Sequence, residues 1–471
     1  MAPLEVVELS PLPPERFESV LEERYPRFAS AIVHAQALFE GRTIWNVNST
    51  AKGGGVAEML RSLLAYTIGA RIDARWVVVD GNSDFFRITK RIHNKLHGAP
   101  GDGGPLEDDQ RRVYESILSR NGEELASLIT EGDVVILHDP QTAGLVEAVK
   151  DTGAAVIWRC HVGLDTPNDE ARSAWRFLRP YVQPADAYVF SRRAFVWEDL
   201  DEDKIAIIPP SIDAFSPKNQ DLSDGAVAAI LTGSGIVSNG SDAEPLYERT
   251  DGRQARVERM ADVVGGPLPH DATVVVQVSR WDRLKDPTGV MRGFADHVAP
   301  RSDAHLMLAG PSVESVADDP EGIEVIEECA ALYADLPAEA RERVHLATLP
   351  MEDGEENAVI VNAIQRHASI VVQKSLAEGF GLTVAEAMWK SRPVVASRIG
   401  GIQDQIEHGR TGLLVDDPKD LSEFGSCVLS LLEDAEGAER MGQEARSRVT
   451  TDFLGPRHLM QYLELVDRLL T

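Results

Sequence analysis

The stretch "SIVVQKSLAEGFGLTVAEAMWKSRPVVAS", Ser369–Ser397, decides the fold of this chain. Two short runs rich in Val flank a glycine-containing turn and a segment with helical character. Continuous apolar runs without polar alternation are typical of strands that are covered on both faces, and such strands pair in parallel. The stretch therefore predicts a strand, a helix and a second parallel strand, which together form the unit of a doubly wound α/β sheet.

The same alternation continues on both sides of this stretch. The second half of the chain adds the strand-like runs "TVVVQVSRW", "AHLMLAGPS", "RVHLATLP" and "TGLLVDD". The first half contains "TIWNVNS", "ARWVVVD", "DVVILHD", "AVIWRCHV", "DAYVFS" and "KIAIIPPS", with helical patterns such as "GVAEMLRSLLAYTIGA" between them. Two doubly wound, Rossmann-like α/β domains in tandem are therefore predicted.

Changes in composition divide the chain into segments. Residues 1–213 are predicted to form the first domain and residues 271–455 the second. Residues 214–270 are rich in Gly, Ser, Asp and Asn, which predicts a connection between the domains with a surface insertion. Residues 456–471 have an amphipathic helical pattern, and this last helix could pack back on the first domain.

The charge balance limits the partners. The 471 residues include 76 acidic and 47 basic residues, for a formal net charge of −29. Such a charge repels nucleic acid and anionic membranes, so neither is an expected partner. An anionic substrate would need a local cluster of cations, which makes Arg and Lys residues at strand ends interesting.

The other expectations on compartment and partners rest on what the sequence lacks. Cys160, Cys329 and Cys427 are far apart, so neither a disulfide framework nor a zinc site is expected. The acidic N-terminal segment has no apolar core typical of a signal peptide, and no run approaches the ~18 apolar residues of a spanning helix. We expect a cytoplasmic protein with small-molecule substrates. The sequence leaves the oligomeric state open, with a homodimer as the candidate.

The segment "SRWDRLKDP", Ser279–Pro287, places two cations after a strand-like run. Ligands of open parallel sheets bind outside the carboxyl ends of the strands. Arg280 offers a fork of donors and Lys285 a point charge, and together they could neutralise a diphosphate. The alternative is surface ion pairing with Asp282 and Asp286.

The segment "STAKGGGVAEML", Ser49–Leu60, has three consecutive glycines before a helical pattern. Free amides at the start of a helix can bind an anion, although the glycines could also serve only a left-handed turn. Lys52 precedes the glycines, so this is no P-loop, and Glu58 excludes the spacing G-x-G-x-x-G. A nicotinamide-dependent oxidoreductase is therefore disfavoured.

The segment "AEGFGLTVAEAM", Ala377–Met388, carries two glutamates eight residues apart. Glu378 follows a strand run and precedes a glycine turn, while Glu386 stands in the helix expected to begin near Thr383. The turn would bring both carboxylates toward one ligand, and the helix N-terminus would add its positive dipole. The alternative is that Glu378 only ends the strand and that Glu386 is a solvated helix residue.

Glu378 and Glu386 form an E-x7-E element that resembles that of retaining glycosyltransferases with the GT-B fold (glycosyltransferase family 4), the large family of sucrose synthase and glycogen synthase. The pieces "SRWDRLKDP", "EGFGLTVAEAMWKSRPVVAS", "GGIQDQIEHGRTGLLVDDP" and "GGGVAEML" resemble that family over nearly the whole chain. "WNVNSTAKGGGVAEML", "LHDPQTAGL" and "WRCHVGLD" are similar to its trehalose-forming branch. The resemblance implies two Rossmann-like domains that face a cleft and close over the donor.

The resemblance also implies roles for individual residues. Arg280 and Lys285 would hold the donor diphosphate and stabilise it as the leaving group. Glu386 would accept hydrogen bonds from the ribose, and Glu378 would bind hydroxyls of the transferred glucose near its 3-position. His161 would lie near the glucose 6-hydroxyl and the reacting carbon. The remaining donor-binding candidates are Gly53, Gly54, Gly55, Met351, Gly379, Phe380, Gly381, Leu382 and Thr383.

A further set of residues next to strand-like runs is expected on the acceptor side: Asn48, His138, Asp139, Asp165 and Trp281. Simpler readings exist for some of them. Asp139 could cap the following helix, and a histidine at a strand end, including His161, is often structural.

The resemblance implies a retaining glucosyltransferase that reversibly forms α,α-trehalose from a nucleoside-diphosphate glucose and glucose. The alternatives are a trehalose phosphorylase of the same fold and another retaining glucosyltransferase with a different acceptor. A non-catalytic sugar-nucleotide sensor would not need both cations and both glutamates. No prosthetic group is expected, and the two cations make a metal unnecessary. The nucleobase (UDP, ADP or GDP) stays open.

Overall fold

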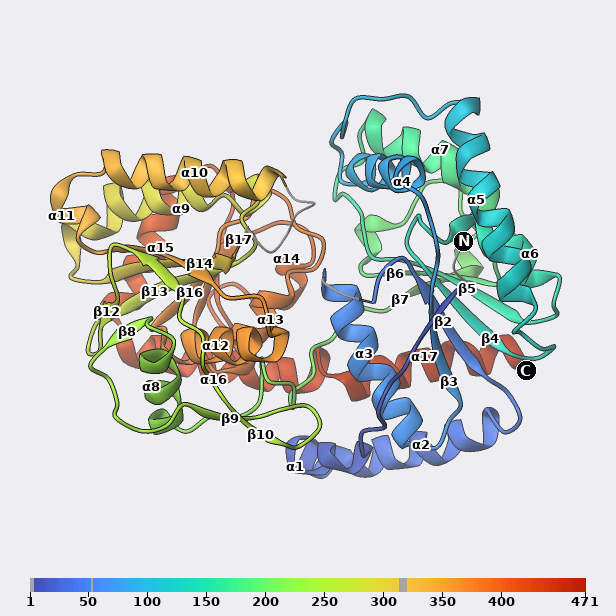
Figure 1. The fold of residues 1–471 in the computed structure, drawn as a ribbon, viewed down its shortest axis with the longest axis horizontal. Coiled ribbons are helices and arrows are strands. Elements are labelled where there is room, and N and C mark those ends of the chain that lie inside the picture. Colours follow the sequence, from blue (N-terminus) through green and yellow to red (C-terminus); the bar gives the residue numbers. More distant parts are fainter. Residues whose placement is uncertain (1–3, 52–53, 313–319) are drawn as a thin grey trace. The chain divides into compact units, whose positions relative to one another are not determined.

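The computed structural model describes residues 4–51, 54–312 and 320–471 (Figure 1). The chain forms two compact units. Unit 1 contains Met1–Ser211 together with Phe453–Thr471, and unit 2 contains Ile212–Asp452. Each unit is built around one twisted sheet with helices on both faces, as the alternation of strands and helices in the sequence predicts.

The sheet of unit 1 has seven strands, parallel except for the first one at the edge. In order across the sheet they are β1 (Glu5–Val7), β3 (Ala74–Val78), β2 (Ile44–Asn48), β4 (Val134–His138), β5 (Ala155–Cys160), β6 (Ala187–Phe190) and β7 (Ile205–Ile207). The strand-like runs of the first half of the sequence all correspond to strands. The edge strand β1 was not predicted, because its three residues carry no periodicity that can be recognised.

Two layers of helices cover this sheet. They are α1 (Glu18–Leu21), α2 (Tyr25–Leu38), α3 (Gly54–Gly69), α4 (Ser83–Leu96), α5 (Asp108–Ala126), α6 (Val146–Lys150), α7 (Asp169–Val182) and α17 (Gly455–Leu470). Helices α4 to α7 pack on one face, and α2, α3 and α17 pack on the other. Helix α17, the last helix of the chain, thus packs on the N-terminal sheet through Leu465 and Val466.

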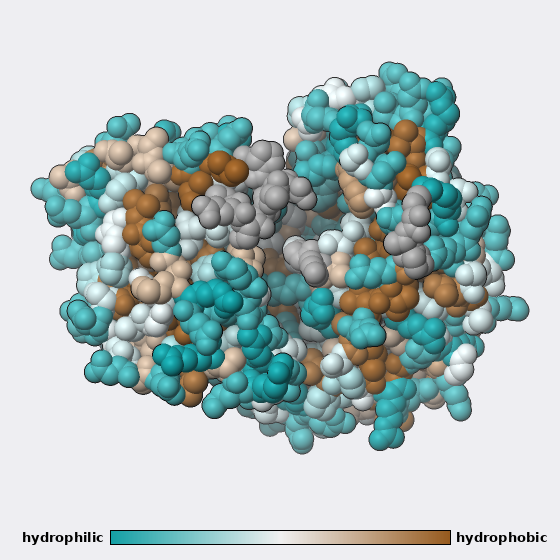
Figure 2. All heavy atoms as spheres, in the orientation of Figure 1, coloured by the Kyte–Doolittle hydropathy of each residue, from teal (hydrophilic) through white to brown (hydrophobic). Residues whose placement is uncertain are grey.

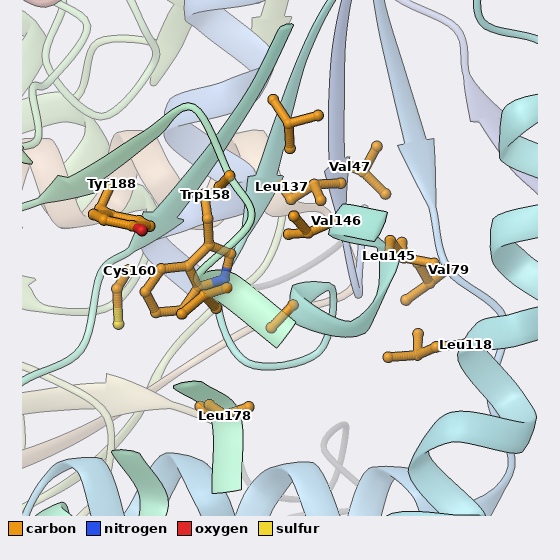
Figure 3. Packing of buried hydrophobic residues seen from close by; sticks show 14 of the residues in the cluster. Val47, Val79, Leu118, Leu137, Leu145, Val146, Trp158, Cys160, Leu178 and Tyr188 are labelled. Carbon is orange, nitrogen blue, oxygen red and sulfur yellow. The ribbon is translucent and has the colours of Figure 1, made fainter. Parts of the chain in front are cut away.

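Strand β4 shows why the apolar runs are continuous. Val135 and Leu137 belong to the core under α4 to α7, while Val134 and Ile136 belong to the core on the opposite face. Figure 3 shows Leu137 beside Val47 and Val146 in the first of these cores, with Trp158 next to them. Side chains alternate between the faces of a strand, so a strand buried on both faces needs apolar residues at every position.

The sheet of unit 2 repeats this plan, again with one antiparallel edge strand, β11. In order across the sheet the strands are β11 (Asp262–Val264), β15 (Val344–Leu349), β14 (His305–Pro311), β13 (Val274–Val278), β16 (Ile370–Gln373), β17 (Val394–Ser397) and β18 (Leu413–Val415). One core cluster joins this sheet to α9, α10 and α15. On the other side α12 packs against β13 and α13 against β16. The bounds of these helices are α9 (Pro287–Gly293), α10 (Pro320–Asp335), α12 (Gly354–His367), α13 (Leu382–Trp389) and α15 (Leu421–Glu433).

Residues 214–270 differ from the predicted linker and surface insertion, because the structure includes them in unit 2. They form α8 (Asp224–Gly233), which packs on α12, and the edge strand β11. They also form two small sheets, in which β9 (Leu246–Glu248) pairs with β10 (Gln254–Arg256) and β8 (Val237–Ser238) with β12 (Leu268–Pro269). The polar composition suggested a linker with a surface insertion, but burial of Ile230 and Tyr247 ties this segment to unit 2. The remaining helices of unit 2 are α11 (Ala338–Arg341), α14 (Ile402–Gln405) and α16 (Ala435–Asp452).

The surface reflects the composition. Hydrophilic side chains prevail on the face drawn in Figure 2, with apolar residues between them. Among the described residues, no helix combines the length and the apolar character needed to cross a membrane.

Candidate active site

The topology of unit 2 singles out one place for a ligand. Its six parallel strands follow the order 3-2-1-4-5-6, so β13 and β16 are neighbours while their connections leave in opposite directions. Such a reversal opens a crevice at the carboxyl ends of the two strands, and ligands of doubly wound sheets bind there. Segments 279–286 and 374–381 follow these two strands, and they contain Arg280, Lys285 and Glu378, which the sequence predicted to contact a ligand.

Lys285 and Glu378 meet at this crevice. The ammonium of Lys285 lies 2.5 Å from a carboxylate oxygen of Glu378, and the two side chains are 17% and 11% exposed. Each residue comes from a different strand end, one after β13 and the other after β16. The pair is therefore a product of the sheet topology, and it places a cation and a carboxylate where a bound molecule would meet both.

Arg280 is held much more loosely. Its side chain is 65% exposed, and one guanidinium nitrogen lies 3.4 Å from Asp282. Asp282 also accepts a hydrogen bond from the main-chain amide of Leu284 and so begins the short 3-10 turn Arg283–Lys285. An exposed pair of this kind contributes little free energy, so the guanidinium can turn toward an anion at small cost.

Asp286 does not pair with the cations at the surface, as the alternative reading had suggested. It caps helix α9 by accepting a hydrogen bond from Gly289 and forms an ion pair with Lys374, whose side chain is fully buried. A Cβ on Gly289 would lie 2.1 Å from the Asp286 carboxylate, so the cap requires glycine there. The pair ties the loop that carries Lys285 to the end of β16.

The glycine turn before α13 is held in place by its packing against Ile402 and the segment at Gly400 and Gly401. Gly381 has φ of +83°, and a Cβ there would lie 2.9 Å from Ile402. A Cβ on Gly400 would lie 1.9 Å from the carbonyl oxygen of Glu378, and the amide of Gly401 donates to the carbonyl of Gly379. Among the residues that the structure describes, no side chain caps the N-terminus of α13. The helix therefore presents its first amides and positive dipole beside Glu378.

Glu386 lies one helical turn further, and it is only 2% exposed. Lys218 approaches its carboxylate at 3.6 Å. Of the other donor-binding candidates, Phe380 is buried, and Thr383 donates to the side chain of Gln373 at 3.1 Å. Gly379, Leu382 and Met351 are half-buried, the last of these in the loop after β15.

Unit 1 has its own topological switch point, between β2 and β4. The glycine loop follows β2 and leads into α3. Gly54 begins that helix with φ of +77°, is exposed, and has open space where a Cβ would be, whereas Gly55 is half-buried. Gly54 is therefore required by its backbone conformation and not by close packing. Gly53 and Lys52 lie outside the residues that the structure describes.

His138, Asp139 and His161 come together at the ends of β4 and β5. One ring nitrogen of His138, Nδ1, lies 3.1 Å from Nε2 of His161, and the two rings are stacked. The Asp139 carboxylate accepts a hydrogen bond of 2.8 Å from the main-chain amide of His161. Asp139 thus holds the backbone of His161 and does not cap a helix. His161 keeps part of its surface accessible.

The hydrogen bonds fix the protonation of the two rings. Nε2 of His138 lies 2.9 Å from the side-chain oxygen of Asn46 and must therefore carry a proton. Burial, with the nearby Arg159 charge, lowers the pKa of His138 to about 3, so the ring is neutral and its Nδ1 accepts. His161 then donates from Nε2. Burial also lowers the pKa of His161 well below its usual range.

Arg159 provides a buried positive charge beneath this cluster. It is fully buried on β5 and donates to the carbonyl of Ile208 at 2.6 Å. Its charge opposes protonation of His138 and His161. Burial raises the pKa of Asp139 to about 6, although the hydrogen bond from His161 and the Arg159 charge work in the opposite direction.

The remaining acceptor-side candidates are engaged inside the protein. Asn48 is buried, accepts from the indole of Trp76 and donates to the carbonyl of Thr50. Asp165 pairs with Arg192 at 2.6 Å. Trp281 differs from the expectation of an acceptor contact, because it is buried in the core of unit 2 and its one polar atom donates to a main-chain carbonyl. The expectation rested on position beside a strand, which does not reveal the direction of a side chain.

Sequence reasoning missed Lys374 and Lys218. Lys374 stands inside the run "VVQKSL", where a lysine directly after a buried strand was the available signal. Its partner Asp286 lies 88 residues away in the chain, so only the fold reveals the pair. Among the residues that the structure describes, no group of three or more His, Cys, Asp or Glu side chains is arranged to hold a metal ion.

Two Rossmann-like units define the GT-B class of glycosyltransferases, and solved structures share this fold. The α,α-trehalose-phosphate synthase (UDP-forming) from Burkholderia vietnamiensis matches with a TM-score of 0.64 at 13% identity, over 90% of this chain and 98% of that one. The HepE protein of Anabaena, in complex with UDP and glucose, matches with a TM-score of 0.60 at 13% identity, over 91% and 100%.

Sequence similarity gives the family. The family "Trehalose synthase, N-terminal domain" matches residues 46–197, and "Glycosyl transferases group 1" matches residues 262–448. Trehalose synthase of Thermococcus litoralis is 35% identical over 422 residues, which cover 90% of this chain and 89% of that protein. Trehalose phosphorylase of Grifola frondosa is 26% identical, over 86% of this chain and 54% of that protein. The chain belongs to the trehalose synthase family of glycosyltransferases.

Proposed function

We propose that this protein transfers glucose from a nucleoside-diphosphate glucose to free glucose and forms α,α-trehalose with retention of configuration. The observation that carries the proposal is the contact of Lys285 with Glu378 at the switch point of unit 2, beside the uncapped N-terminus of α13. Membership of the trehalose synthase family supports the product.

The donor diphosphate would bind to Arg280, Lys285 and the first amides of α13. Breaking the bond between glucose C1 and the phosphate oxygen leaves negative charge on the diphosphate and positive charge on the sugar ring. Cations fixed in advance stabilise the leaving group where that charge develops. The exposed side chain of Arg280 would turn toward the phosphate when the donor binds. Lys285 already lies at the switch point, and it would give up its ion pair with Glu378 to bind the diphosphate.

Glu378 would then bind hydroxyls of the transferred glucose. The pair with Lys285 keeps this carboxylate ordered before the donor arrives, and the released carboxylate can accept hydrogen bonds from the sugar. Glu386 is our candidate for the ribose hydroxyls, with Lys218 beside it in the free protein.

The acceptor step follows from the same chemistry. The anomeric hydroxyl oxygen of the acceptor glucose forms a bond to C1 on the face that the diphosphate leaves, and its proton passes to a phosphate oxygen of the departing nucleotide. This route retains the configuration without a protein nucleophile. His161 is our candidate for the 6-hydroxyl of the transferred glucose. As a neutral ring it can take part in hydrogen bonds without adding a positive charge beside the developing cationic sugar.

A nucleotide donor is supported by the solved relatives of the fold, since the HepE protein of Anabaena was determined with UDP and with UDP-glucose. The substrates we propose are a nucleoside-diphosphate glucose, glucose and trehalose. No metal is needed for charge balance, because Arg280 and Lys285 supply positive charge to the diphosphate.

A trehalose phosphorylase is the second candidate, and similarity to the fungal phosphorylases favours it. In that reaction inorganic phosphate would take the place of the nucleotide at the same cations. Burial of Glu386 within α13 favours the nucleotide, because a buried carboxylate would repel free phosphate but can accept hydrogen bonds from ribose hydroxyls.

One experiment separates these functions. The protein is incubated with UDP-, ADP- or GDP-glucose and glucose, and the disaccharide and its two anomeric linkages are identified by NMR. A parallel incubation contains trehalose and inorganic phosphate without nucleotide. We expect formation of α,α-trehalose in the first arm and no release of glucose from trehalose in the second. Phosphate-dependent release of glucose in the second arm would replace the synthase by the phosphorylase.

A further inference from the structure

The hairpin of β9 and β10 has no role in the function derived so far. Its strands pair Glu248 with Gln254 and Leu246 with Arg256, and Gly252 makes the turn with φ of +81°. Tyr247 on β9 is buried, so the hairpin is anchored in unit 2 and is not a free flap.

Arg249, at the end of β9, clamps the start of α12. Its guanidinium forms ion pairs with Asp353 and with Glu355, the latter at 3.1 Å. The main-chain amide of Thr250 donates to Glu355 at 3.2 Å. The fork of Arg249 thus bridges two carboxylates and depends on the planar shape of a guanidinium. The Arg249 pairing holds the pKa of Asp353 below its usual range.

A second set of contacts joins the segment that follows the hairpin to the same helix, α12. Glu356 is 2% exposed and accepts hydrogen bonds of 2.7 Å from the main-chain amides of Glu258 and Arg259. The Arg259 side chain also pairs with Glu356. The segment from β9 to Arg259 is therefore fixed to the first turn of α12 at two points.

These contacts hold the loop that joins β15 to α12. Asp353 ends this loop and accepts hydrogen bonds from the amides of Glu355 and Glu356 as the cap of α12. The side chain of Asn357 donates to the carbonyl of Pro350 at 3.0 Å. The loop residues between these anchors are Met351 and Glu352.

The loop lies on the ligand side of the sheet, at the carboxyl end of β15. Strand β15 is two strands from β13, which corresponds to about 10 Å at the usual spacing. A nucleotide whose diphosphate lies at the switch point reaches about that far with its base. The loop is therefore at the right distance to meet the base edge.

We propose that the hairpin residue Arg249 sets the nucleobase selectivity by fixing the loop around Met351. The inference rests on the nucleotide donor proposed above. Reading a base by hydrogen bonds needs polar main-chain groups in fixed positions, because a rigid site leaves them unpaired when the wrong base binds. A mobile loop would adapt to each base and lose this discrimination. Arg249 would affect the base through the loop that it holds in place, and it is therefore a positioning residue.

The test measures the dissociation constants of UDP, ADP, GDP and pyrophosphate by titration calorimetry for the wild type and for Arg249→Ala and Arg249→Lys. We expect both variants to bind the preferred nucleotide about tenfold more weakly and the other two with little change, so that the preference narrows. Binding of pyrophosphate should stay unchanged. In assays of glucose transfer, KM for the donor should rise by a similar factor while kcat at saturating donor changes little.

Arg253→Ala is the matched control. Arg253 lies in the same hairpin and is 78% exposed, and within the described part of the chain its ion-pair partner is Asp251, so this variant removes the same charge and leaves the loop around Met351 in place. It should keep the wild-type preference. Thermal unfolding shows whether the variants fold. An equal loss for all three nucleotides, or none, would overturn the role of Arg249. If the wild type binds no nucleotide, the proposed function itself fails.

Discussion

At the scale of the residue, the pair of Lys285 and Glu378 serves both the stability of the free protein and the binding of a substrate. Both side chains are largely buried, and an isolated charge in such a place is costly, so each stabilises the other in the free protein. The same arrangement keeps a cation and a carboxylate in position for a substrate that carries phosphate and hydroxyl groups. Replacement of either residue therefore affects both stability and activity.

Lys285→Ala should lower kcat for glucose transfer by about 10²–10³-fold, because a fixed cation on the leaving phosphate contributes on that order. Steady-state kinetics check this. Arg283→Ala is the control, since Arg283 stands in the same 3-10 turn but pairs with Glu324 and Glu328 on α10. The control should keep the wild-type kcat. Near wild-type activity of Lys285→Ala would remove Lys285 from the site.

Buried histidines predict sensitivity to acid. Burial lowers the pKa of His458 well below its usual range, with Arg457, Arg159 and His138 opposing its protonation further. A lowered pKa means that folding favours the neutral ring. The contribution of His458 to the free energy of unfolding is complete above the unfolded pKa of about 6.5. It is lost as the pH falls below that value, at about 1.4 kcal/mol per pH unit. Asp139, whose pKa is raised, acts in the opposite sense between about pH 6 and pH 4.

We therefore expect His458→Leu to reduce the loss of unfolding free energy between pH 7 and pH 5 by about 2 kcal/mol. Urea unfolding of wild type and variant at both pH values gives the difference. His270→Gln, which changes an exposed histidine, is the control. An unchanged pH dependence in His458→Leu would show that this ring is protonated in the folded protein.

At the scale of the element, the turn before α13 depends on how two loops pack. The loop Glu378–Gly381 passes so close to the segment at Gly400 that a side chain has no room there. The fit fixes the direction of α13, and with it the direction in which the first amides and Glu378 point. Glycine at 381 thus serves the backbone conformation and the packing together.

Gly381→Ala should lower kcat by at least about tenfold and destabilise unit 2 by about 1–3 kcal/mol, since alanine is strained at positive φ and its methyl group would press on Ile402. Kinetics and urea unfolding measure the two effects. Gly354→Ala, at the start of α12, meets open space and should change neither quantity. Equal behaviour of the two variants would contradict the importance of this turn.

The sequence allowed the strands and the loops after them to be predicted, because buried parallel strands carry continuous apolar runs. "TVVVQV" and "DVVILH" correspond to β13 and β4 in full. The strand order could not be predicted, and it is the order that brings β13 next to β16. The structure differs from the linker and surface insertion predicted for residues 214–270 for the same reason: α8 and β11 are stabilised by distant partners, which local composition does not reveal.

The same limit explains what was predicted of the site. Arg280, Lys285 and Glu378 were named from their positions after strands, and the fold places two of them in contact. The side-chain directions of Asn48, the last residue of β2, and of Trp281, which follows β13, could not be predicted, because both side chains point into the protein. Side-chain direction depends on neighbours from other segments.

At the scale of the whole molecule, the net charge of −29 matters for both folding and binding. Repulsion among so many like charges weakens the compact state, and the same field repels an anionic donor. The cations at the switch point must act against that field at short range. Salt screens the long-range repulsion much more than the largely buried pair of Lys285 and Glu378.

Raising KCl from 20 to 200 mM should therefore increase Tm by about 2–4 °C, because screened repulsion adds on the order of 1 kcal/mol. Calorimetry at pH 7.5 checks this, and the effect should shrink at pH 5.5, nearer the pI of about 4.8. A fall in Tm with salt would mean that favourable surface ion pairs outweigh the net repulsion.

Helix α17 affects how the protein is made. It covers the face of the N-terminal sheet that contains Val134 and Ile136, yet residues 453–471 leave the ribosome only after all of unit 2 has been synthesised. The first unit therefore cannot complete its core during its own translation. A nascent chain that contains only residues 1–211 presents an uncovered apolar surface, and it depends on chaperones or on speed of synthesis until the last helix arrives.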